Sequence, residues 1–483
     1  MKLHIKHILA ILTALFVAFC TNSKDKGSIS YVLRHEGDRI AVDMTINNHG
    51  QDTIVLKYGD RNAGGMPDII TWLKNLKIKG ASCKIDSTNV EFVLTKAKKK
   101  VSISYCVKNT LPADYAPKST CLYDMFRPDI TGDMMYVNGF NLFILPKDEA
   151  LRSAPASVKW QKLPPYPAFC LYNPGGGLQD FLGTADDLDG TVIVGDPLLV
   201  VDKVTTGTAT NYIVTAARKH PEHNRAAIRD FFNRVYPTMR SFWNDTTTRP
   251  YTLILFPFRN NTFKTSGNGL NGGFCSRYDA TADTILDLDR MTLFTHEIGH
   301  NWVGDYSNMW FGEGFNDLQT IYTMVETKLA PPSFIVDYVN DYIQKLYHSK
   351  LRNITKQESD DNFWNRSNRD YSWIPYWRGM LYGFYLCGLI EQNTGSKQPY
   401  HDMMHALTDY KSHMIPEKFL EIMSTFIPRE RLEKDFNDCV INGSDIPFSN
   451  GELLSGLTVT YGDDGIPKVE ISDTDAFNRR WEK

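Results

Sequence analysis

The sequence predicts a multidomain α+β protein with an N-terminal all-β domain, a central α/β domain and a C-terminal α-helical domain. Apolar residues alternate with polar ones along the first two hundred positions, which is typical of strands. After Thr215 helical and strand-like patterns are mixed, and after Pro331-Pro332 the apolar spacing is helical. With 483 residues, 42% of them apolar and 23% charged, the chain is long enough for more than one core.

The N-terminal pattern has the two-residue period of half-buried strands. Ile40, Val42, Met44 and Ile46 form one such run, and turn residues at 47–50 end it. Similar runs recur through the segment, so we expect a β-rich domain, a sandwich or a saddle, over residues 28–204.

The central and C-terminal patterns favour different folds. Residues 225–242 have helical spacing and residues 251–258 resemble a buried strand, so residues 205–330 are expected to form the α/β domain. Residues 331–448 are predicted to be helical. A short tail, residues 449–483, contains a hairpin signal around Gly462-Asp463-Asp464-Gly465.

The N-terminus resembles a secretory signal of the bacterial lipoprotein type. A basic start precedes an apolar run, residues 8–19, that is too short to span a bilayer. Residues 1–20 are therefore predicted to be a signal peptide, with Cys20 as the lipidated residue, although Phe19 replaces the small residue usual before it. We expect export across the inner membrane of a bacterium and a lipid anchor on the periplasmic or outer-membrane surface.

Charge and cysteine content exclude some classes of protein. A net charge of −3 without a clustered basic stripe argues against nucleic-acid binding. The eight cysteines include no Cys-x-x-Cys pair, so a structural zinc cluster is not expected. Seven cysteines remain if Cys20 is lipidated, and pairings among Cys83, Cys106, Cys121 and Cys170 stay open. The literal Gly-x-Gly-x-x-Gly at 267–272 neither follows a strand nor opens a helix, which disfavours a dinucleotide site.

The sequence Thr295-His296-Glu297-Ile298-Gly299-His300 contains the His-Glu-x-x-His pattern. On a helix this spacing places two imidazoles on one face, the geometry that a zinc ion needs, and the adjacent glutamate can act as a general base. The alternative is an amphipathic helix that contains the pattern by chance. An apolar stripe that includes Phe294 and Ile298, together with a glycine where a better helix former would be more stable, favours zinc.

A third zinc ligand is expected downstream of the two histidines. The metzincin pattern fails because Val303 and Tyr306 stand where its glycine and third histidine would be. Glu313, at the start of an apolar-periodic run, is favoured over Asp305, which lies in a turn-like cluster. Asp317, one helical turn after Glu313, either fixes the tautomer of a ligating histidine or is a solvated surface residue.

These motifs resemble the gluzincin metallopeptidases, and most closely the glycyl aminopeptidase family, a relative of aminopeptidase N and leukotriene A4 hydrolase. The matching residues are His296-Glu297-x-x-His300-x-Trp302 followed by Trp310-Phe311-x-Glu313-Gly314-Phe315. The resemblance implies a thermolysin-like zinc catalytic domain. It implies one Zn²⁺ on His296, His300 and Glu313, with Glu297 as base and Asp317 orienting a histidine.

Two more segments match the family. Gly272-Gly273-Phe274-Cys275 corresponds to a Gly-Gly-x-Glu motif on a strand that edges the zinc cleft and pairs with substrate. Cys275 replaces the glutamate that holds the substrate's free amino terminus, and Asp279 or Asp283 could substitute for it. The Tyr-x-Lys/Arg-Gly signature matches Tyr376-Trp377-Arg378-Gly379, which implies that Tyr376 stabilises the oxyanion. A packing role for Tyr376 is the alternative, with Tyr371 as the other candidate.

The expected function is therefore zinc-dependent hydrolysis of peptide bonds by a zinc-activated water. The missing glutamate leaves recognition of a free amino terminus open, so aminopeptidase and endopeptidase both remain. The alternatives are a catalytically silent, zinc-retaining surface lipoprotein that binds peptides or glycans, and a zinc hydrolase of a non-peptide substrate. Expected partners are a peptide or protein substrate and, through Cys20 alone, a membrane.

The tail is too short for the PDZ domain found in many relatives. His401 and His405 also lie four residues apart but lack the glutamate and a third ligand, so we expect a surface helix there.

Overall fold

The computed structural model describes most of the chain. The residues described are 27–59, 69–108, 126–175, 178, 180–216, 222–257, 266–270, 272–278, 286–304, 307–363, 365 and 367–481. Cys20, Cys121, Asp279, Asp283 and Asp305 lie outside these ranges, so the expectations about them stay predictions. Cys83, Cys106, Cys170, Cys275, Cys387 and Cys439 are free thiols. Within the ranges described, no helix is both long and apolar enough to cross a membrane.

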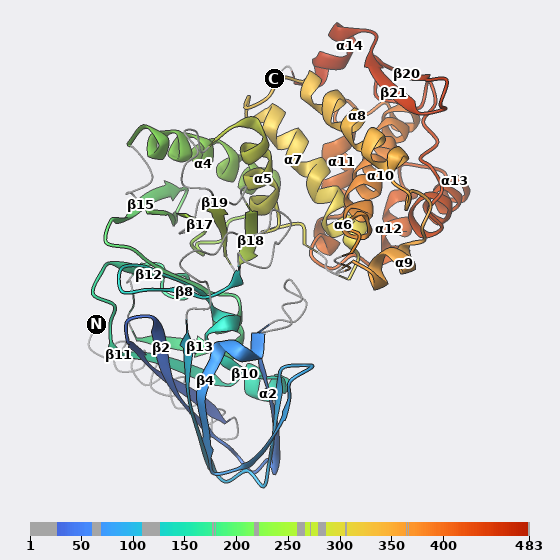
Figure 1. Ribbon diagram of the computed structural model, residues 1–483. Coiled ribbons are helices and arrows are strands. Elements are labelled where there is room, and N and C mark those ends of the chain that lie inside the picture. The colour runs from blue at the N-terminus through green and yellow to red at the C-terminus, as the bar shows by residue number, and fades with distance from the viewer. Residues whose placement is uncertain are drawn as a thin grey trace, which may run out of the picture.

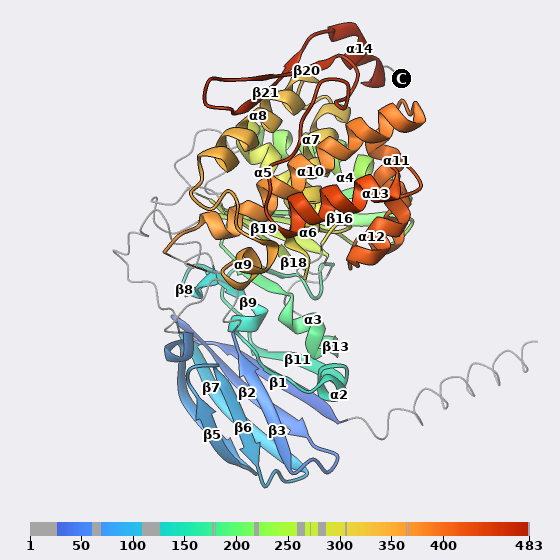
Figure 2. The same ribbon diagram turned by 90° about the vertical axis from the view of Figure 1, so that its right-hand side faces the viewer.

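The N-terminal region is a β-sandwich, at the bottom of Figures 1 and 2. A six-stranded sheet, in the order β13-β11-β1-β2-β7-β4, packs against a four-stranded sheet, β10-β3-β6-β5. Alternate residues such as Ile40, Val42 and Met44 point into the shared core, as the sequence pattern predicts. The strands are β1 (Ser28–His35), β2 (Arg39–Asn47), β3 (Thr53–Tyr58), β4 (Leu73–Lys79), β5 (Ser82–Asp86), β6 (Glu91–Thr95), β7 (Lys100–Lys108), β10 (Ile144–Pro146), β11 (Pro155–Lys162) and β13 (Phe181–Thr184).

A small third sheet connects the sandwich to the rest of the protein. Its strand order is β12-β14-β9-β8, and its apolar residues pack against the central sheet. Arg277 of the central sheet pairs with Asp129 of β8 at 3.2 Å, and both side chains are fully buried. The guanidinium also lies 4.2 Å from the ring centroid of Tyr136. The strands are β8 (Asp129–Ile130), β9 (Met135–Asn138), β12 (Ala168–Cys170) and β14 (Val192–Gly195), and the short helices nearby are α2 (Glu149–Arg152) and α3 (Ala185–Asp189).

The central region is a five-stranded sheet covered on one face by helices. The strand order is β15-β16-β17-β19-β18; β16, β17 and β19 are parallel to one another, and both outer strands are antiparallel to their neighbours. Because β15 pairs with β16 as a hairpin, this sheet begins at Leu199, before the expected boundary at residue 204. Its strands are β15 (Leu199–Thr206), β16 (Ala209–Ala216), β17 (Thr252–Pro257), β18 (Ser266–Leu270) and β19 (Gly273–Tyr278), with helices α4 (Glu222–Phe242) and α5 (Leu288–Gly299).

The C-terminal region is helical and lies beside the central sheet (Figure 1). Its longest helix, α10, runs through the helical core and is buried on nearly all sides from Ile374 to Ile390. The helices are α6 (Met309–Gly312), α7 (Gly314–Glu326), α8 (Ser333–His348), α9 (Lys356–Asp361), α10 (Asp370–Thr394), α11 (Pro399–Ala406), α12 (Pro416–Met423), α13 (Arg429–Asp435) and α14 (Thr474–Asn478). The mixed α+β architecture predicted from the sequence is confirmed.

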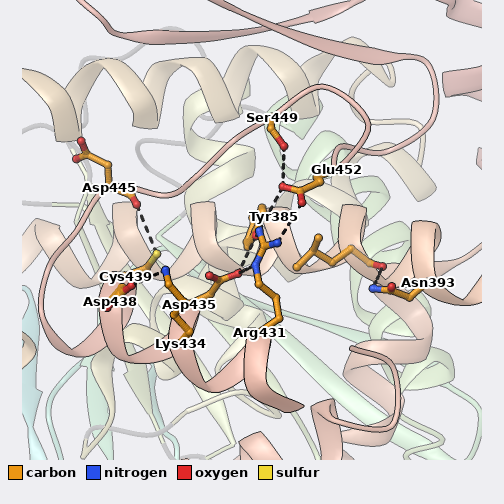
Figure 3. Close-up of polar contacts among 11 residues, drawn as sticks. Tyr385, Asn393, Arg431, Lys434, Asp435, Asp438, Cys439, Asp445, Ser449 and Glu452 are labelled. Carbon is orange, nitrogen blue, oxygen red and sulfur yellow. Dashed lines mark hydrogen bonds and ion pairs between the residues drawn. The ribbon is translucent and has the colours of Figure 1, made fainter. Parts of the chain in front are cut away.

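The tail folds back onto the helices. Its strands β20 (Leu457–Tyr461) and β21 (Pro467–Ile471) form the predicted hairpin. The segment that leads to it is held by a polar cluster in which Arg431 contacts Asp435, the Tyr385 hydroxyl and Glu452 (Figure 3). Ser449 donates to Glu452 at 2.6 Å. Because Tyr385 lies on α10, this cluster fastens the start of the tail to the central helix.

Candidate active site

Helix α5 places two histidines on one face. Asp287 caps its N-terminus by accepting a hydrogen bond from the backbone N–H of Arg290 at 2.8 Å. Phe294 and Ile298 are buried against the sheet and the other helices. His296 and His300 follow one turn apart, with ring centroids separated by 4.6 Å. The helix expected from the His-Glu-x-x-His pattern is therefore present.

Glu313 comes to the two histidines from the junction of α6 and α7. Its Oε2 atom lies 3.2 Å from Nε2 of His296 and 3.3 Å from Nε2 of His300. Glu313 is 5% exposed and His296 is 7% exposed. The structure thus brings together the two histidines and the carboxylate that the sequence favoured.

The outer ring nitrogens of the histidines have separate acceptors. Nδ1 of His296 lies 2.7 Å from Oδ1 of Asp317, which is buried, so the carboxylate accepts its N–H. Nδ1 of His300 lies 2.9 Å from the carbonyl oxygen of Val303. These contacts assign the proton of each neutral ring to Nδ1, which leaves the Nε2 lone pairs directed towards Glu313.

The donor set fits a zinc ion. Two neutral imidazole nitrogens and a carboxylate oxygen are a typical catalytic zinc set. Ligand atoms about 2.0–2.1 Å from a tetrahedral zinc are about 3.3 Å from one another, close to the separations seen here. Among the residues described, this is the one group of three or more such side chains with donor atoms within 4.8 Å of one another.

The charges in the site favour a bound cation. Burial by itself would raise the pKa of Glu313, but His300 and His296 outweigh burial and hold that pKa well below its usual range. Burial disfavours a charged His296, yet Asp317 and then Glu313 raise its pKa well above the ordinary value. A proton or a metal cation can satisfy this excess of negative charge.

Glu297 faces an edge strand of the sheet. A Cβ atom built on Gly267 of β18 would lie 3.0 Å from Oε1 of Glu297, and one built on Gly269 would lie 3.6 Å from Oε2. These alternate glycines share one face of the strand, so its backbone lies next to the carboxylate. Burial raises the pKa of Glu297 above its ordinary value.

The expected pairing of substrate with Gly272, Gly273 and Phe274 does not fit their positions. Gly273 and Phe274 belong to β19, which is hydrogen-bonded to β17 on one side and to β18 on the other. Gly272, with φ of +79°, lies in the turn between β18 and β19. Among the residues described, β18 is the outermost strand on this side of the sheet, and it carries the alternating Gly267 and Gly269.

Cys275 does not occupy the place of a substrate anchor. It is fully buried on the other face of the sheet, in the core shared with the third sheet. Burial raises the pKa of its thiol to about 12, so it remains protonated. The edge strand β18 reads Ser-Gly-Asn-Gly-Leu and carries no carboxylate of its own.

Tyr376 lies over the histidines from α10. Its ring centroid is 5.8 Å from that of His296, with the planes 21° apart. Gly314 of α7 and Gly379 of α10 allow this approach, because a Cβ on Gly314 would lie 2.5 Å from Cα of Gly379. Burial and then Glu313 raise the pKa of Tyr376 well above its ordinary value, so its hydroxyl is a neutral donor. Tyr371 lies on the first turn of α10, where its carbonyl accepts from Ser359.

Tyr342 contacts Asp317 of the site, and the sequence did not predict this contact. Its hydroxyl donates to Oδ2 of Asp317 at 2.6 Å, and it comes from α8, 25 residues further along the chain. The spacing of Tyr338 and Tyr342, four residues apart on one helix, was the available signal, but nothing in it points to Asp317.

The second histidine pair forms no comparable site. On α11, Nε2 of His401 contacts Glu326 of α7, and Nε2 of His405 lies 2.8 Å from the carbonyl oxygen of Phe242. The two rings are 6.0 Å apart. Since each Nε2 atom has its own partner, the two nitrogens do not converge on one point.

Comparisons with known proteins place the fold. No family model and no curated protein sequence matches the chain. A solved structure of an aminopeptidase N family protein from Idiomarina loihiensis aligns over 91% of this chain and 81% of its own, with a TM-score of 0.70 and 13% identity. An M1 zinc metallopeptidase from Deinococcus radiodurans aligns over 87% of this chain and 95% of its own, with a TM-score of 0.50 and 16% identity. The chain has the fold of these metallopeptidases.

A further M1 structure was solved with a peptide. It is a mutant of the Deinococcus radiodurans enzyme bound to a Tyr-Ser-Ala substrate, and it covers 88% of this chain and 95% of its own at 15% identity and a TM-score of 0.50. At such low identities the likeness establishes the M1 metallopeptidase fold. The resemblance read from the sequence is therefore confirmed as a structural one.

Proposed function

We propose that this protein is a zinc metallopeptidase that hydrolyses peptide bonds at the metal centre formed by His296, His300 and Glu313. The observation that carries the proposal is the convergence of His296, His300 and Glu313, with Nδ1 of both histidines already hydrogen-bonded. When bound, zinc supplies Lewis acidity that polarises a carbonyl and acidifies water. The peptide bound in the related M1 structure is consistent with this class of substrate.

Glu297 is proposed as the general base. Its carboxylate lies beside the metal ligands, and burial raises its pKa, which makes it a better proton acceptor. It can therefore take a proton from the attacking water and return it to the leaving amine. Tyr376, a neutral donor above His296, can hydrogen-bond the oxyanion that forms at the attacked carbonyl.

The outer edge of β18 is proposed to hold the substrate backbone. An extended peptide can add to such an edge as a further strand, and the glycines Gly267 and Gly269 bring the backbone of β18 close to Glu297. β18 offers no carboxylate to bind an α-ammonium group. We therefore expect cleavage that does not require a free amino terminus.

Aromatic side chains of α10 lie next to the metal ligands. Trp373 is 37% exposed, and its ring centroid lies 5.1 Å from that of Tyr376. The Arg369 guanidinium lies 5.6 Å from the centroid of the Trp373 indole ring. An exposed indole next to the reaction site favours large apolar side chains near the scissile bond.

The test uses a peptide pool in which half of the peptides are N-terminally acetylated. Zinc-loaded protein and the Glu297→Gln variant are incubated with the pool, and new termini are mapped by mass spectrometry. We expect cuts in both halves, absent with the variant and enriched beside large apolar residues. Cuts confined to free amino termini would show an aminopeptidase. No cuts at all would contradict the proposal and favour peptide binding without turnover or a non-peptide substrate.

A further inference from the structure

The buried carboxylate of Asp317 is held at both of its oxygens. Oδ1 accepts from Nδ1 of His296 at 2.7 Å, and Oδ2 accepts from the hydroxyl of Tyr342 at 2.6 Å. Asp317 is 3% exposed, and neither partner is a lysine or an arginine. A buried carboxylate without its hydrogen bonds is costly, so these two donors fix its orientation.

The hydroxyl groups around Asp317 form a chain with one direction. Tyr342 and Tyr338 lie one turn apart on α8, with their oxygens 3.0 Å from each other. A carboxylate only accepts, so the single hydrogen of the Tyr342 hydroxyl goes to Asp317. Tyr338 must then be the donor to Tyr342. Such a chain polarises each successive bond towards the carboxylate.

The C-terminal tail holds the helix that carries this chain. The Asn340 side chain makes two hydrogen bonds with the backbone of Val469 in β21, at 2.8 and 2.9 Å. Asn340 thus pairs with the strand much as a neighbouring strand would. Asn340 lies two residues before Tyr342, so the contact restrains the stretch of α8 that carries Tyr342.

We propose that Tyr342 is a positioning residue of the metal centre, which acts by fixing Asp317 so that His296 presents Nε2 towards His300 and Glu313. The proposal rests on the zinc centre proposed above and adds a contribution from α8 and the tail, outside the ligand-bearing helices. Outer contacts of this kind typically change metal affinity by about 10–100-fold.

The test is the zinc affinity of the full chain and of Tyr342→Phe, measured by competition with a chromophoric chelator. Phenylalanine keeps the ring and removes the hydrogen bond, so we expect affinity to fall about tenfold. The visible spectrum of the cobalt-loaded variant should change as well, because the orientation of a ligand is altered. Tyr338→Phe should lower zinc affinity less than Tyr342→Phe, since it removes only the second donor in the chain.

Tyr382→Phe serves as the matched control. Tyr382 is a fully buried tyrosine on α10, packed near the rings of Phe419 and Phe436. Removing the Tyr382 hydroxyl should leave zinc affinity and the cobalt spectrum unchanged. An equal loss of affinity in this control would mean that any buried tyrosine of the helical region matters, and the proposal would be overturned.

A double-mutant cycle separates positioning from general packing. In an Asp317→Ala background, Tyr342→Phe should cause no further loss of zinc affinity, because its partner is gone. The proposal would be overturned if Tyr342→Phe lowered zinc affinity as much in the Asp317→Ala background as in the wild type. It would also be overturned if Tyr342→Phe alone had the zinc affinity of the wild type. If Tyr342→Phe does not fold, the same cycle is run with Tyr338→Phe. These measurements need no peptide, so a wild-type protein that binds zinc but cleaves nothing would contradict the peptidase function alone.

Discussion

The chain contains two histidine pairs with the same four-residue spacing, and only one of them forms a convergent site. On α5, the Nδ1 atoms of His296 and His300 are hydrogen-bonded and their Nε2 atoms face Glu313. On α11, the Nε2 atoms of His401 and His405 are themselves engaged, by Glu326 and by a backbone carbonyl. The four-residue spacing places two imidazole rings on one face of a helix. Whether they can bind a metal depends on which ring nitrogen is already hydrogen-bonded and on whether the other nitrogens point to a common centre.

The largest effect is expected when the carboxylate that completes the first pair is removed. Glu313→Ala leaves two ligands, which is too few for a catalytic zinc site. We expect loss of stoichiometric zinc and of all peptide cleavage. Zinc content after dialysis against a weak chelator measures the change, and the double histidine variant of α5 sets the zinc-free reference. A Glu313→Ala protein that kept a full equivalent of zinc would place the ligand elsewhere.

A second variant separates catalysis from metal binding within the same pair. Glu297→Gln keeps the size of the side chain but cannot accept a proton, so turnover should fall about 10²–10⁴-fold. Zinc content should remain that of the wild type, because Glu297 is not a ligand. Initial rates on one cleaved peptide give the comparison. Wild-type turnover in this variant would remove Glu297 from its role as base.

Zinc affinity should depend steeply on pH at the first pair. The pKa values of His296 and His300 are raised, for His296 chiefly by Asp317 and for His300 chiefly by Glu313, against the effect of burial. A raised pKa means that protons compete with the metal up to a higher pH. Affinity should therefore fall as pH is lowered, starting above the ordinary histidine range, by about tenfold per pH unit for each proton displaced. Chelator competition between pH 6 and 9 would show it. A flat profile would contradict the raised pKa values of His296 and His300.

Gly299 distinguishes α5 from an ordinary amphipathic helix. A Cβ atom there would lie 2.2 Å from Oδ1 of Asn316, whose Nδ2 donates to the carbonyl of His296 at 2.8 Å. Gly299→Ala should therefore force α5 and α7 apart and lower the free energy of unfolding by about 1–3 kcal/mol, despite the better helix propensity of alanine. Chemical denaturation of the metal-free protein measures it. An unchanged or higher stability would show that the helices have room.

The smallest effect is expected at the carboxylate of the second pair. Glu326 contacts His401, whose side chain is 24% exposed, and even a fully charged contact at such a partly exposed position contributes only about 0–1 kcal/mol. Glu326→Ala should leave zinc content and turnover unchanged, with a slight loss of thermal stability. It is the matched counterpart of Glu313→Ala, and any loss of zinc here would undo the distinction between the pairs.

The parts of the site that the sequence could predict are those that lie close together along the chain. His296 lies on α5 and His300 caps the C-terminus of that helix. Glu313 follows after one short connection, so spacing and residue type identify all three. The order of strands in a sheet leaves no such trace. For this reason the sequence pointed to Gly272–Phe274 as the strand beside the zinc, whereas among the residues described the outer strand β18 carries Gly267 and Gly269. Tyr342 was missed because its contact with Asp317 depends on how α8 packs on α7.

The claim that zinc binds at the first histidine pair and not at the second is tested most directly by the zinc stoichiometry of three proteins dialysed side by side. They are the wild type, His296→Ala/His300→Ala and His401→Ala/His405→Ala. We predict one zinc per chain in the wild type and in the α11 variant, and none in the α5 variant. Zinc retained by the α5 variant, or lost from the α11 variant, would contradict the assignment of the metal centre to α5 and α7.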